Sequence, residues 1–521
     1  MPTTPSGREV RIIDATPVID ATPVIDATPE AGSDRTATPG PTRCEHDSLG
    51  SREVPELAYY GIHTSRALAN FAISGIALRT YPEFVNALAA VKQAAAGANR
   101  ELGLLDDERA AAIEAACTEI RDGELHDQFV VDVIQGGAGT STNMNANEVV
   151  ANRALEILGA RRGDYDRLHP LEHVNRSQST NDVYPTAMKV ALQVHIATLH
   201  ATLLEVSAAF LTKANEFSRV LKMGRTQLQD AVPMTLGQEF GTYAVMVAED
   251  AERLQEAAQL VAEINLGGTA IGTGLNSHPE YARLVCERLR AITGFPLTTA
   301  HDLVEATQDV GSFVQLSGVL KRTALKLSKI CNDLRLLSSG PRSGFNEINL
   351  PAVQAGSSIM PGKVNPVIPE VVNQVAFEVV GNDVTISMAA EAGQLQLNAF
   401  EPIIAHCLFQ SLTHLNEACK TLIGNCVVGI TANEQRLYES VTNSIGIITA
   451  LNPYIGYAAS ARIAKLALST GRAIPDLVVE EGLLSSEEVG VLLTPEALVQ
   501  PRELVQLGEE IVESFKGANP S

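Results

Sequence analysis

The chain contains no tryptophan, and only 4% of its 521 residues are aromatic. Its seven cysteines form no Cys-x-x-Cys pair, and their odd number leaves at least one without a disulfide partner. Small secreted domains held together by disulfides show the opposite pattern. We therefore expect reduced thiols, a core large enough to be stable without cross-links, and a cytoplasmic location.

Basic clusters and long apolar runs are also missing. Lys and Arg total 39 against 61 Asp and Glu, which gives a formal net charge of −22. Nucleic-acid binding needs a basic face, and a membrane span needs about 18 consecutive apolar residues. The N-terminus does not show the basic-then-apolar order of a signal peptide. The sequence therefore predicts neither nucleic-acid nor membrane partners.

Several common catalytic motifs are absent. The eleven histidines show no His-Glu-x-x-His or other ligand spacing, so no metal site is predicted. There is no Gly-x-Ser-x-Gly elbow, and the glycine-rich residues 267–276 lack the spacing of a dinucleotide fingerprint. Residues 356–366, GSSIMPGKVNP, are not a phosphate-binding P-loop either, because Val364 follows Lys363 where a Ser or Thr is needed.

The N-terminus carries a short repeat, IDATPV-IDATPV-IDATPE, at residues 13–30. A proline at every sixth position blocks helix, and few large apolar side chains are present to offset the entropy of ordering. We expect residues 1–40 to form a disordered extension.

The rest of the sequence is typical of helices. Residues 83–102 and 106–121 predict helices of ordinary length, whereas residues 186–218, 235–265 and 302–338 predict unusually long ones. Rods of about 45 Å are hard to cover within one chain, so we expect a bundle assembled from several subunits. After Glu401 we expect shorter helices. The expected divisions are 1–40, a helical domain 41–179, a long-helix domain 180–430, and a small domain 431–521.

Four polar loops adjoin these helices, at residues 135–148, 173–182, 224–233 and 356–366. Any one of them could simply cap a helix with its Ser, Thr, Asn or Asp side chains. Four together provide hydroxyls, amides and backbone N–H groups at helix N-termini, which suits a small anion such as a carboxylate. One lysine, Lys363, can add a positive charge.

The GSSIMPGKVNP segment resembles the signature of the fumarase/aspartase superfamily, whose members release fumarate by elimination. The segments QGGAGTSTNMNANE, HVNRSQSTND, KMGRTQLQDAVPMTLGQEF, LGGTAIGTGLN and NSIGIITALNP resemble the aspartase branch, in order, over nearly all of the chain after the extension. The resemblance implies a mainly α, three-domain fold. It also implies a homotetramer whose central helices form a twenty-helix core, with active sites shared between subunits.

The activity implied by the resemblance is the reversible elimination of ammonia from L-aspartate to give fumarate. No organic cofactor is implied, and an activating divalent cation is left open. Class II fumarase, acting on L-malate, is the alternative within the superfamily: Gly362 favours it, whereas Gln227 in place of a typical His, and Gln354 before the signature, favour aspartase. A catalytically inactive helical scaffold is the distant alternative.

The resemblance also implies roles for individual residues. Ser357 would be the general base, and Gln227, His173 and Glu370 would support the site. The residues implied to bind substrate are Thr140, Ser179, Thr180, Asn181, Thr226, Ser358, Lys363 and Asn365. Gly356 and Gly362 suit a loop that closes on substrate.

Overall fold

The computed structural model describes residues 40–499. The expected extension, residues 1–40, and its repeat lie outside this part except for Gly40. The described residues from Thr42 onward belong to one structural unit. The expected domain boundaries within that unit stay a prediction.

The N-terminal part begins with an antiparallel hairpin, β1 (Thr42–Asp47) and β2 (Gly50–Pro55). Four helices follow it: α1 (Ile62–Asn70), α2 (Pro82–Glu101), α3 (Asp107–Arg121) and α4 (Thr140–Ile157). The two helices predicted for this part, 83–102 and 106–121, are confirmed within one residue as α2 and α3. Asp106 caps α3 by accepting a hydrogen bond from the Arg109 N–H.

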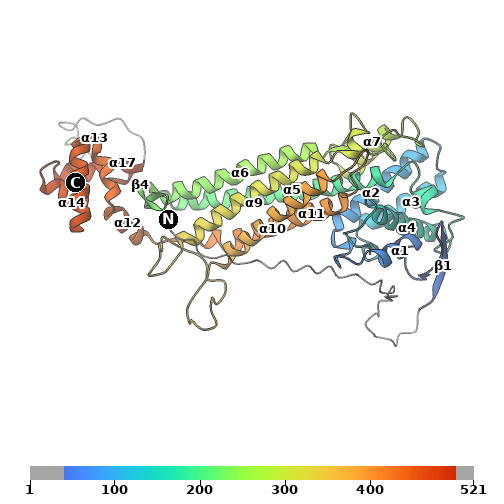
Figure 1. Cartoon of the computed structure of the whole chain (residues 1–521), viewed down its shortest axis with the longest axis horizontal. Helices are drawn as coiled ribbons and strands as arrows, with labels where there is room; N and C mark the ends of the chain where they lie inside the picture. Colours follow the sequence, from blue (N-terminus) through green and yellow to red (C-terminus); the bar gives the residue numbers. More distant parts are fainter. Residues whose placement is uncertain (1–39, 500–521) are drawn as a thin grey trace, which may run out of the picture. The chain divides into compact units, whose positions relative to one another are not determined.

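Five long helices run side by side through the middle of the chain (Figure 1). They are α5 (Thr180–Glu216), α6 (Leu236–Leu260), α9 (Gly311–Leu337), α10 (Val367–Glu391) and α11 (Glu401–Asn425). Helix α5 packs against α6 and α11, and α9 packs against α6 and α10. The three predicted long helices are present, but some of their bounds differ. Helix α6 ends at Leu260 rather than at 265, and α9 begins at Gly311 rather than at 302, because the extended backbone of Asp309 separates it from a short helix over 305–308. The mainly α fold predicted from the sequence is correct.

Helix α5 begins at Thr180, six residues before the predicted start at 186. The prediction placed the start after Pro185, because a proline usually ends or precedes a helix. Pro185 has no N–H to donate to the carbonyl of Asn181, which would leave that oxygen without its helical partner. The Asn265 side chain donates to the Asn181 oxygen at 3.0 Å instead. A neighbouring segment therefore supplies the hydrogen bond that the proline removes.

Two other expectations about this region were wrong. Helices do not shorten directly after Glu401, because α11 runs for 25 residues from that position; Pro402 stands in the first turn, where a proline is tolerated. Residues 224–233 are not a loop but most of a hairpin, β3 (Leu221–Thr226) and β4 (Gln229–Thr235). Its two-residue turn, Gln227 and Leu228, has the left-handed φ values of 54° and 62° that hairpin turns require.

The remaining elements are short. Between the long helices lie β5 (Glu263–Ile264), α7 (Tyr281–Thr293), β6 (Thr298–Thr299), α8 (Glu305–Gln308) and β7 (Ile348–Asn349). After α11 come β8 (Thr431–Ala432), α12 (Glu434–Thr442), α13 (Asn452–Ile455), α14 (Tyr457–Thr470), α15 (Ile474–Glu480), α16 (Ser486–Leu492) and α17 (Pro495–Val499).

The buried apolar side chains form two clusters. The larger cluster extends from the N-terminal helices through the five long helices, and the smaller one joins residues 441–492 to Leu221 and Met223 of β3. The hairpin base therefore packs with the C-terminal segment rather than with the long helices alone. All seven cysteines, which lie within the described residues, are free thiols as the sequence predicts.

Helix α5 is unusually apolar. By length and composition alone it could cross a membrane, since an 18-residue window has a mean hydropathy of 1.4, and only 33% of that window is buried in the single chain. The core helix of a soluble protein can match this length and composition, and α5 packs against α2, α6 and α11. Its exposed apolar side chains include Leu204 and Leu211.

One buried carboxyl group generates a stability prediction. Glu401, the first residue of α11, is 3% exposed, and its Oε2 has no hydrogen-bond partner among the described residues. Burial raises the pKa of Glu401 to about 8, and the charge of Lys189 only partly opposes this shift. A raised pKa means that the folded chain favours the protonated acid, so stability falls as the pH rises from about 4.5 towards 8.

Replacing Glu401 with Gln should therefore raise the unfolding temperature at pH 8, and the gain should shrink towards pH 5, where the native acid is protonated. Glu434 occupies the same position in α12 but is exposed. The Glu434→Gln variant serves as the control, with no such trend. A Glu401→Gln gain that stays constant between pH 5 and pH 8 in thermal unfolding monitored by circular dichroism would contradict this account.

Candidate active site

The first group of predicted site residues lies where α4 begins. Gly139 precedes the helix with a φ of 87°, and a Cβ there would lie 2.1 Å from the Tyr184 ring, so no other residue fits. Thr140 is the first helical residue; its side chain is exposed, and its Oγ1 donates to the carbonyl of Gly137 at 2.7 Å. The glycine cluster thus places a threonine hydroxyl at a helix N-terminus.

The second group caps α5. The Ser179 hydroxyl accepts a hydrogen bond from the Asn181 N–H at 3.3 Å, and Asp182 accepts one from the Ser179 N–H, completing a capping box. The Asn143 amide, in the first turn of α4, donates to Thr180 Oγ1 at 3.1 Å. The structure therefore brings the N-termini of α4 and α5 together, and both present backbone N–H groups that favour an anion.

A buried lysine that the sequence analysis did not identify lies behind these N-termini. Lys92 of α2 donates to the side-chain oxygens of Asn143 at 2.6 Å, Asn175 at 3.0 Å and Gln178 at 2.9 Å. Burial lowers the pKa of its ammonium to about 7. No motif marks this residue; the one sequence signal is a lysine in the alanine-rich, mostly apolar stretch AAVKQAAAG.

Asp182 joins the glycine-rich segment 267–276 to this region. Its Oδ2 accepts hydrogen bonds from the N–H groups of Gly267 at 3.0 Å and Thr269 at 2.9 Å. Burial raises the pKa of Asp182 to about 6, and it outweighs the backbone hydrogen bonds that favour the anion. Asn181 donates to the carbonyl of Ala270 at 2.7 Å. This segment therefore supports the N-terminus of α5.

His173 lies on a π-helical turn, Pro170–Val174, just before the α5 cap. Its Nδ1 accepts a hydrogen bond from the His169 N–H at 2.8 Å. Burial lowers the pKa of the imidazole. The ring is thus held in one orientation close in sequence to Ser179.

Thr226 and Gln227 form a separate group at the other end of α5. They lie at the tip of the β3–β4 hairpin, which is separated from the C-terminal end of α5 by four residues. A helix of 37 residues is about 55 Å long, so the hairpin tip is far from Thr180 in the same chain.

The signature loop, residues 356–366, forms the third group. The Ser357 hydroxyl oxygen accepts hydrogen bonds from the N–H groups of Ile359 at 3.2 Å and Met360 at 3.0 Å. The loop is closed on itself: the Gly356 N–H donates to the carbonyl of Lys363 at 2.8 Å, and the Asn365 side chain donates to the carbonyl of Gly356 at 2.7 Å.

Three predicted residues of this loop region have no side-chain partner. No hydrogen bond or ion pair within residues 40–499 involves the Ser358 hydroxyl, the Lys363 ammonium or the Glu370 carboxylate, and Ser358 and Lys363 are exposed. Glu370 lies in the first turn of α10. The same loop therefore carries an exposed lysine and a serine oxygen that two N–H groups already contact.

The segment that leads into the loop lies beside the hairpin. Glu347, 2% exposed, forms an ion pair with Lys222 at 2.9 Å and a second pair with Arg225. The predicted residues thus fall into an N-terminal group at the start of α5 and two groups near its far end.

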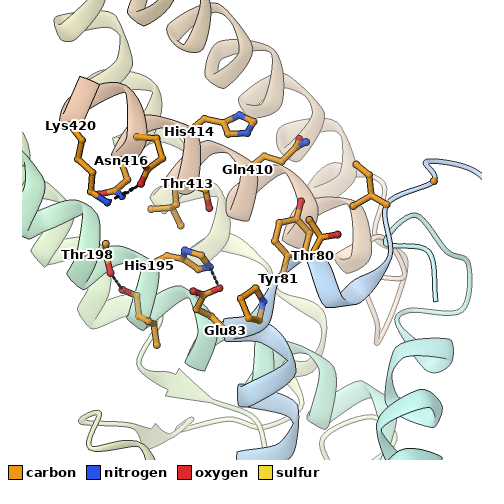
Figure 2. A pocket seen from close by; sticks show the side chains of 16 residues that line it. Thr80, Tyr81, Glu83, His195, Thr198, Gln410, Thr413, His414, Asn416 and Lys420 are labelled. Carbon is orange, nitrogen blue, oxygen red and sulfur yellow. Dashed lines mark hydrogen bonds and ion pairs between the residues drawn. The ribbon is translucent and has the colours of Figure 1, made fainter. Parts of the chain in front are cut away.

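A cavity of about 610 Å³ lies between α2, α5 and α11 and contains none of the predicted residues (Figure 2). Its charged side chains mostly contact one another, with His195 Nε2 3.6 Å from Glu83 and Lys420 2.9 Å from Glu417.

No group of three or more His, Cys, Asp or Glu that could hold a metal occurs among the described residues.

Comparison with known proteins places the chain in a family. Residues 50–381 match the sequence pattern of the family described as Lyase, and residues 447–500 match that of the fumarase C C-terminus. The aspartate ammonia-lyase of Pseudomonas aeruginosa is 60% identical over 88% of this chain and 98% of its own length.

Two solved structures have the same fold. The fumarate lyase:delta crystallin of Brucella melitensis is 55% identical, with a TM-score of 0.87 over 88% of this chain and all of that chain. The class II fumarase of Schistosoma mansoni is 34% identical, with a TM-score of 0.84 over 89% of this chain and all of that chain.

The tight contact between Gly139 and Tyr184 generates a prediction. Gly139→Ala should destabilise the protein by about 1–3 kcal/mol more than Gly159→Ala, since both residues have a positive φ but only Gly139 lacks room for a Cβ. Chemical unfolding of the two variants measures the difference. Equal losses would show that the ring does not constrain the start of α4.

Proposed function

Because the chain belongs to the lyase family of the fumarases and aspartate ammonia-lyases, we propose that it catalyses the reversible elimination of ammonia from L-aspartate to give fumarate. The chain is a carbon–nitrogen lyase. The similarity to aspartate ammonia-lyases along almost their whole length carries this proposal. Class II fumarase is the second candidate, and the lower identity to a fumarase disfavours it.

In this proposal the N-termini of α4 and α5 bind one end of the substrate. Thr140, Ser179, Thr180 and Asn181 provide hydroxyl and amide groups, and the backbone N–H groups beside them carry partial positive charge. These donors bind the amino group of the substrate and the carboxylate that is not next to the carbon losing its proton. Lys92, through Asn143, and His173 fix their positions. Thr226 and Gln227 complete this side of the site from another chain.

Ser357 is the proposed general base. A serine hydroxyl has too high a pKa for this role unless its alkoxide is stabilised. The N–H groups of Ile359 and Met360 already donate to its oxygen, which favours the anion over the alcohol. The unpaired Lys363 ammonium adds positive charge in the same loop. Closure of the exposed loop would remove water and strengthen both effects.

The alkoxide takes a proton from the carbon next to the second carboxylate. The electron pair of that C–H bond moves into the carboxylate, which becomes a doubly charged aci-form. Ser358, Lys363 and Asn365 are proposed to stabilise this charge, because electrostatic stabilisation of a developing anion is the main task in such a reaction. The substrate amine is present as an ammonium group. The electrons of the aci-form then make the carbon–carbon double bond, the C–N bond breaks with its electron pair staying on nitrogen, and neutral ammonia leaves. The proton taken up by Ser357 passes to solvent before the next turnover. Glu370 supports the loop.

We propose that the enzyme is a homotetramer whose active sites combine residues of different subunits. Two observations support this. The N-terminal group and the hairpin lie at opposite ends of α5, about 55 Å apart, which is too far for one small substrate. In addition, Phe377, Val384 and Met388 lie on one face of α10 and are 67%, 54% and 68% exposed.

We propose no organic cofactor, a cytoplasmic location, and no role for nucleic acid or membranes. The chemistry above uses only side chains and backbone N–H groups of the protein, so a divalent cation would act at most as an activator.

The decisive experiment is the ultraviolet absorbance of fumarate after addition of L-aspartate, L-malate or buffer, each with and without EDTA. We expect fumarate to form from L-aspartate but not from L-malate or buffer. The rate with L-aspartate should be largely retained in EDTA. Formation from L-malate would identify a fumarase, and no fumarate from either substrate would indicate an inactive scaffold.

Ser357→Ala should lower kcat by roughly 10²–10⁴-fold, the usual contribution of a general base, and leave the oligomer intact. Ser343→Ala, which changes another serine of the segment before the signature loop, is the control and should keep wild-type kcat. Steady-state kinetics and size-exclusion chromatography measure both properties. Substantial turnover by Ser357→Ala would rule out Ser357 as the base.

A further inference from the structure

The hairpin that carries Thr226 and Gln227 is packed in an apolar cluster at its base, but its tip is exposed. Leu221 and Met223 are 8% and 0% exposed in the C-terminal apolar cluster. From Thr226 to Asp230 every residue is exposed. The turn residues Gln227 and Leu228 adopt left-handed backbone conformations, which cost free energy in residues other than glycine. Something other than apolar packing must fix this tip.

The residues on either side of the turn point to what fixes it. Arg225 and Asp230 are directly opposite each other in the two strands, an arrangement in which opposite charges usually pair. No ion pair between them occurs within residues 40–499. Arg225 instead pairs with Glu347 and lies 4.4 Å from the centre of the Phe345 ring. Each strand of the tip is therefore held by a different segment.

Asp230 is held by the C-terminal segment. Its Oδ2 accepts a hydrogen bond from the Ser444 hydroxyl at 2.8 Å, and Ser444 is only 4% exposed. The Ser444 oxygen in turn accepts from the Gly446 N–H at 3.1 Å. One serine thus binds the hairpin and caps the short 3₁₀ turn that begins at Ile445.

A bulge brings β4 into a second contact with the same segment. The pairing register shifts between Met223 and Arg225, so that Ala231 and Val232 lie opposite Gly224. A Cβ on Gly446 would lie 2.4 Å from the carbonyl oxygen of Ala231. Residues 444–446 therefore contact β4 at Asp230 and at the bulge, directly beside the turn.

We propose that Asp230 and Ser444 are positioning residues, whose hydrogen bond holds Thr226 and Gln227 in the geometry that the reaction needs. Neither residue is placed at the substrate. The proposal rests on the proposed function, in which Thr226 binds substrate and Gln227 supports the site. A hydrogen bond between a turn and a nearly buried serine restricts the tip without occupying the site.

Kinetics of four variants test the pair. Asp230→Ala and Ser444→Ala should each lower kcat/KM for L-aspartate about tenfold, since small displacements of binding groups have large effects on rate. The kcat/KM of the double variant should be within about twofold of that of the less active single variant, because both substitutions remove the same interaction. Asp230→Asn should stay near wild type, since the Asn oxygen still accepts from Ser444.

Ser485→Ala is the matched control. Ser485 caps α16 with a capping box in the same C-terminal part of the chain, and no hydrogen bond between it and the hairpin occurs within residues 40–499. Ser485→Ala should lower stability by removing a helix cap, as Ser444→Ala does. It should leave kcat/KM unchanged. An equal kinetic effect of Ser444→Ala and Ser485→Ala would reduce Ser444 to a cap and overturn the proposal.

Amide hydrogen exchange of residues 224–232, followed by mass spectrometry, gives a readout that needs no substrate. Exchange should be faster in Asp230→Ala and Ser444→Ala than in wild type, Asp230→Asn or Ser485→Ala. Unchanged exchange in Asp230→Ala would overturn the positioning role. A wild-type protein that releases no fumarate from L-aspartate would overturn the proposed function instead, and the exchange result would still decide the role of the pair.

Discussion

The length of α5 is the constraint on which the rest of the structure depends. One unbroken helix of 37 residues places Ser179, Thr180 and Asn181 at its start and the Thr226 hairpin just after its end. Because a helix rises about 1.5 Å per residue, these groups cannot meet on one small dicarboxylate within a single chain. The apolar faces that the single chain leaves exposed, on α5 and on α10, lie on the same rods that keep the groups apart. The separation of the proposed site residues and the proposed association of subunits therefore have one structural cause.

The groups near the α4 and α5 N-termini also suggest how a chain with a net charge of −22 would bind the proposed anionic substrate. Local fields at helix N-termini act over a few ångströms and do not depend on the total charge. Buried groups behind them, Lys92 and Asp182, contact side chains and backbone of this region rather than solvent. At the far end, the signature loop combines two N–H donors on Ser357 with the unpaired Lys363. At each end of α5, the groups that favour an anion are therefore a few local N–H donors and a lysine.

The long helices could be predicted from sequence because their apolar spacing extends over several turns. The proposed site residues were chosen from the polar loops between these helices, and their roles stay a prediction. The start of α5 could not, since Pro185 is tolerated only because Asn265, distant in sequence, donates to the Asn181 oxygen. The hairpin was missed because its turn is Gln-Leu, without the glycine or asparagine that usually marks left-handed φ values. Lys92 was missed because its three amide partners come from two other segments.

The central claim is that each active site combines the start of α5 from one chain with the signature loop of another. Mixing inactive Ser357→Ala and inactive Thr180→Ala subunits, by refolding them together, tests it most directly. The account predicts that the mixture regains fumarate production from L-aspartate, because some sites then combine an intact loop with an intact helix N-terminus. A mixture as inactive as either parent, although mixed oligomers form, would contradict it.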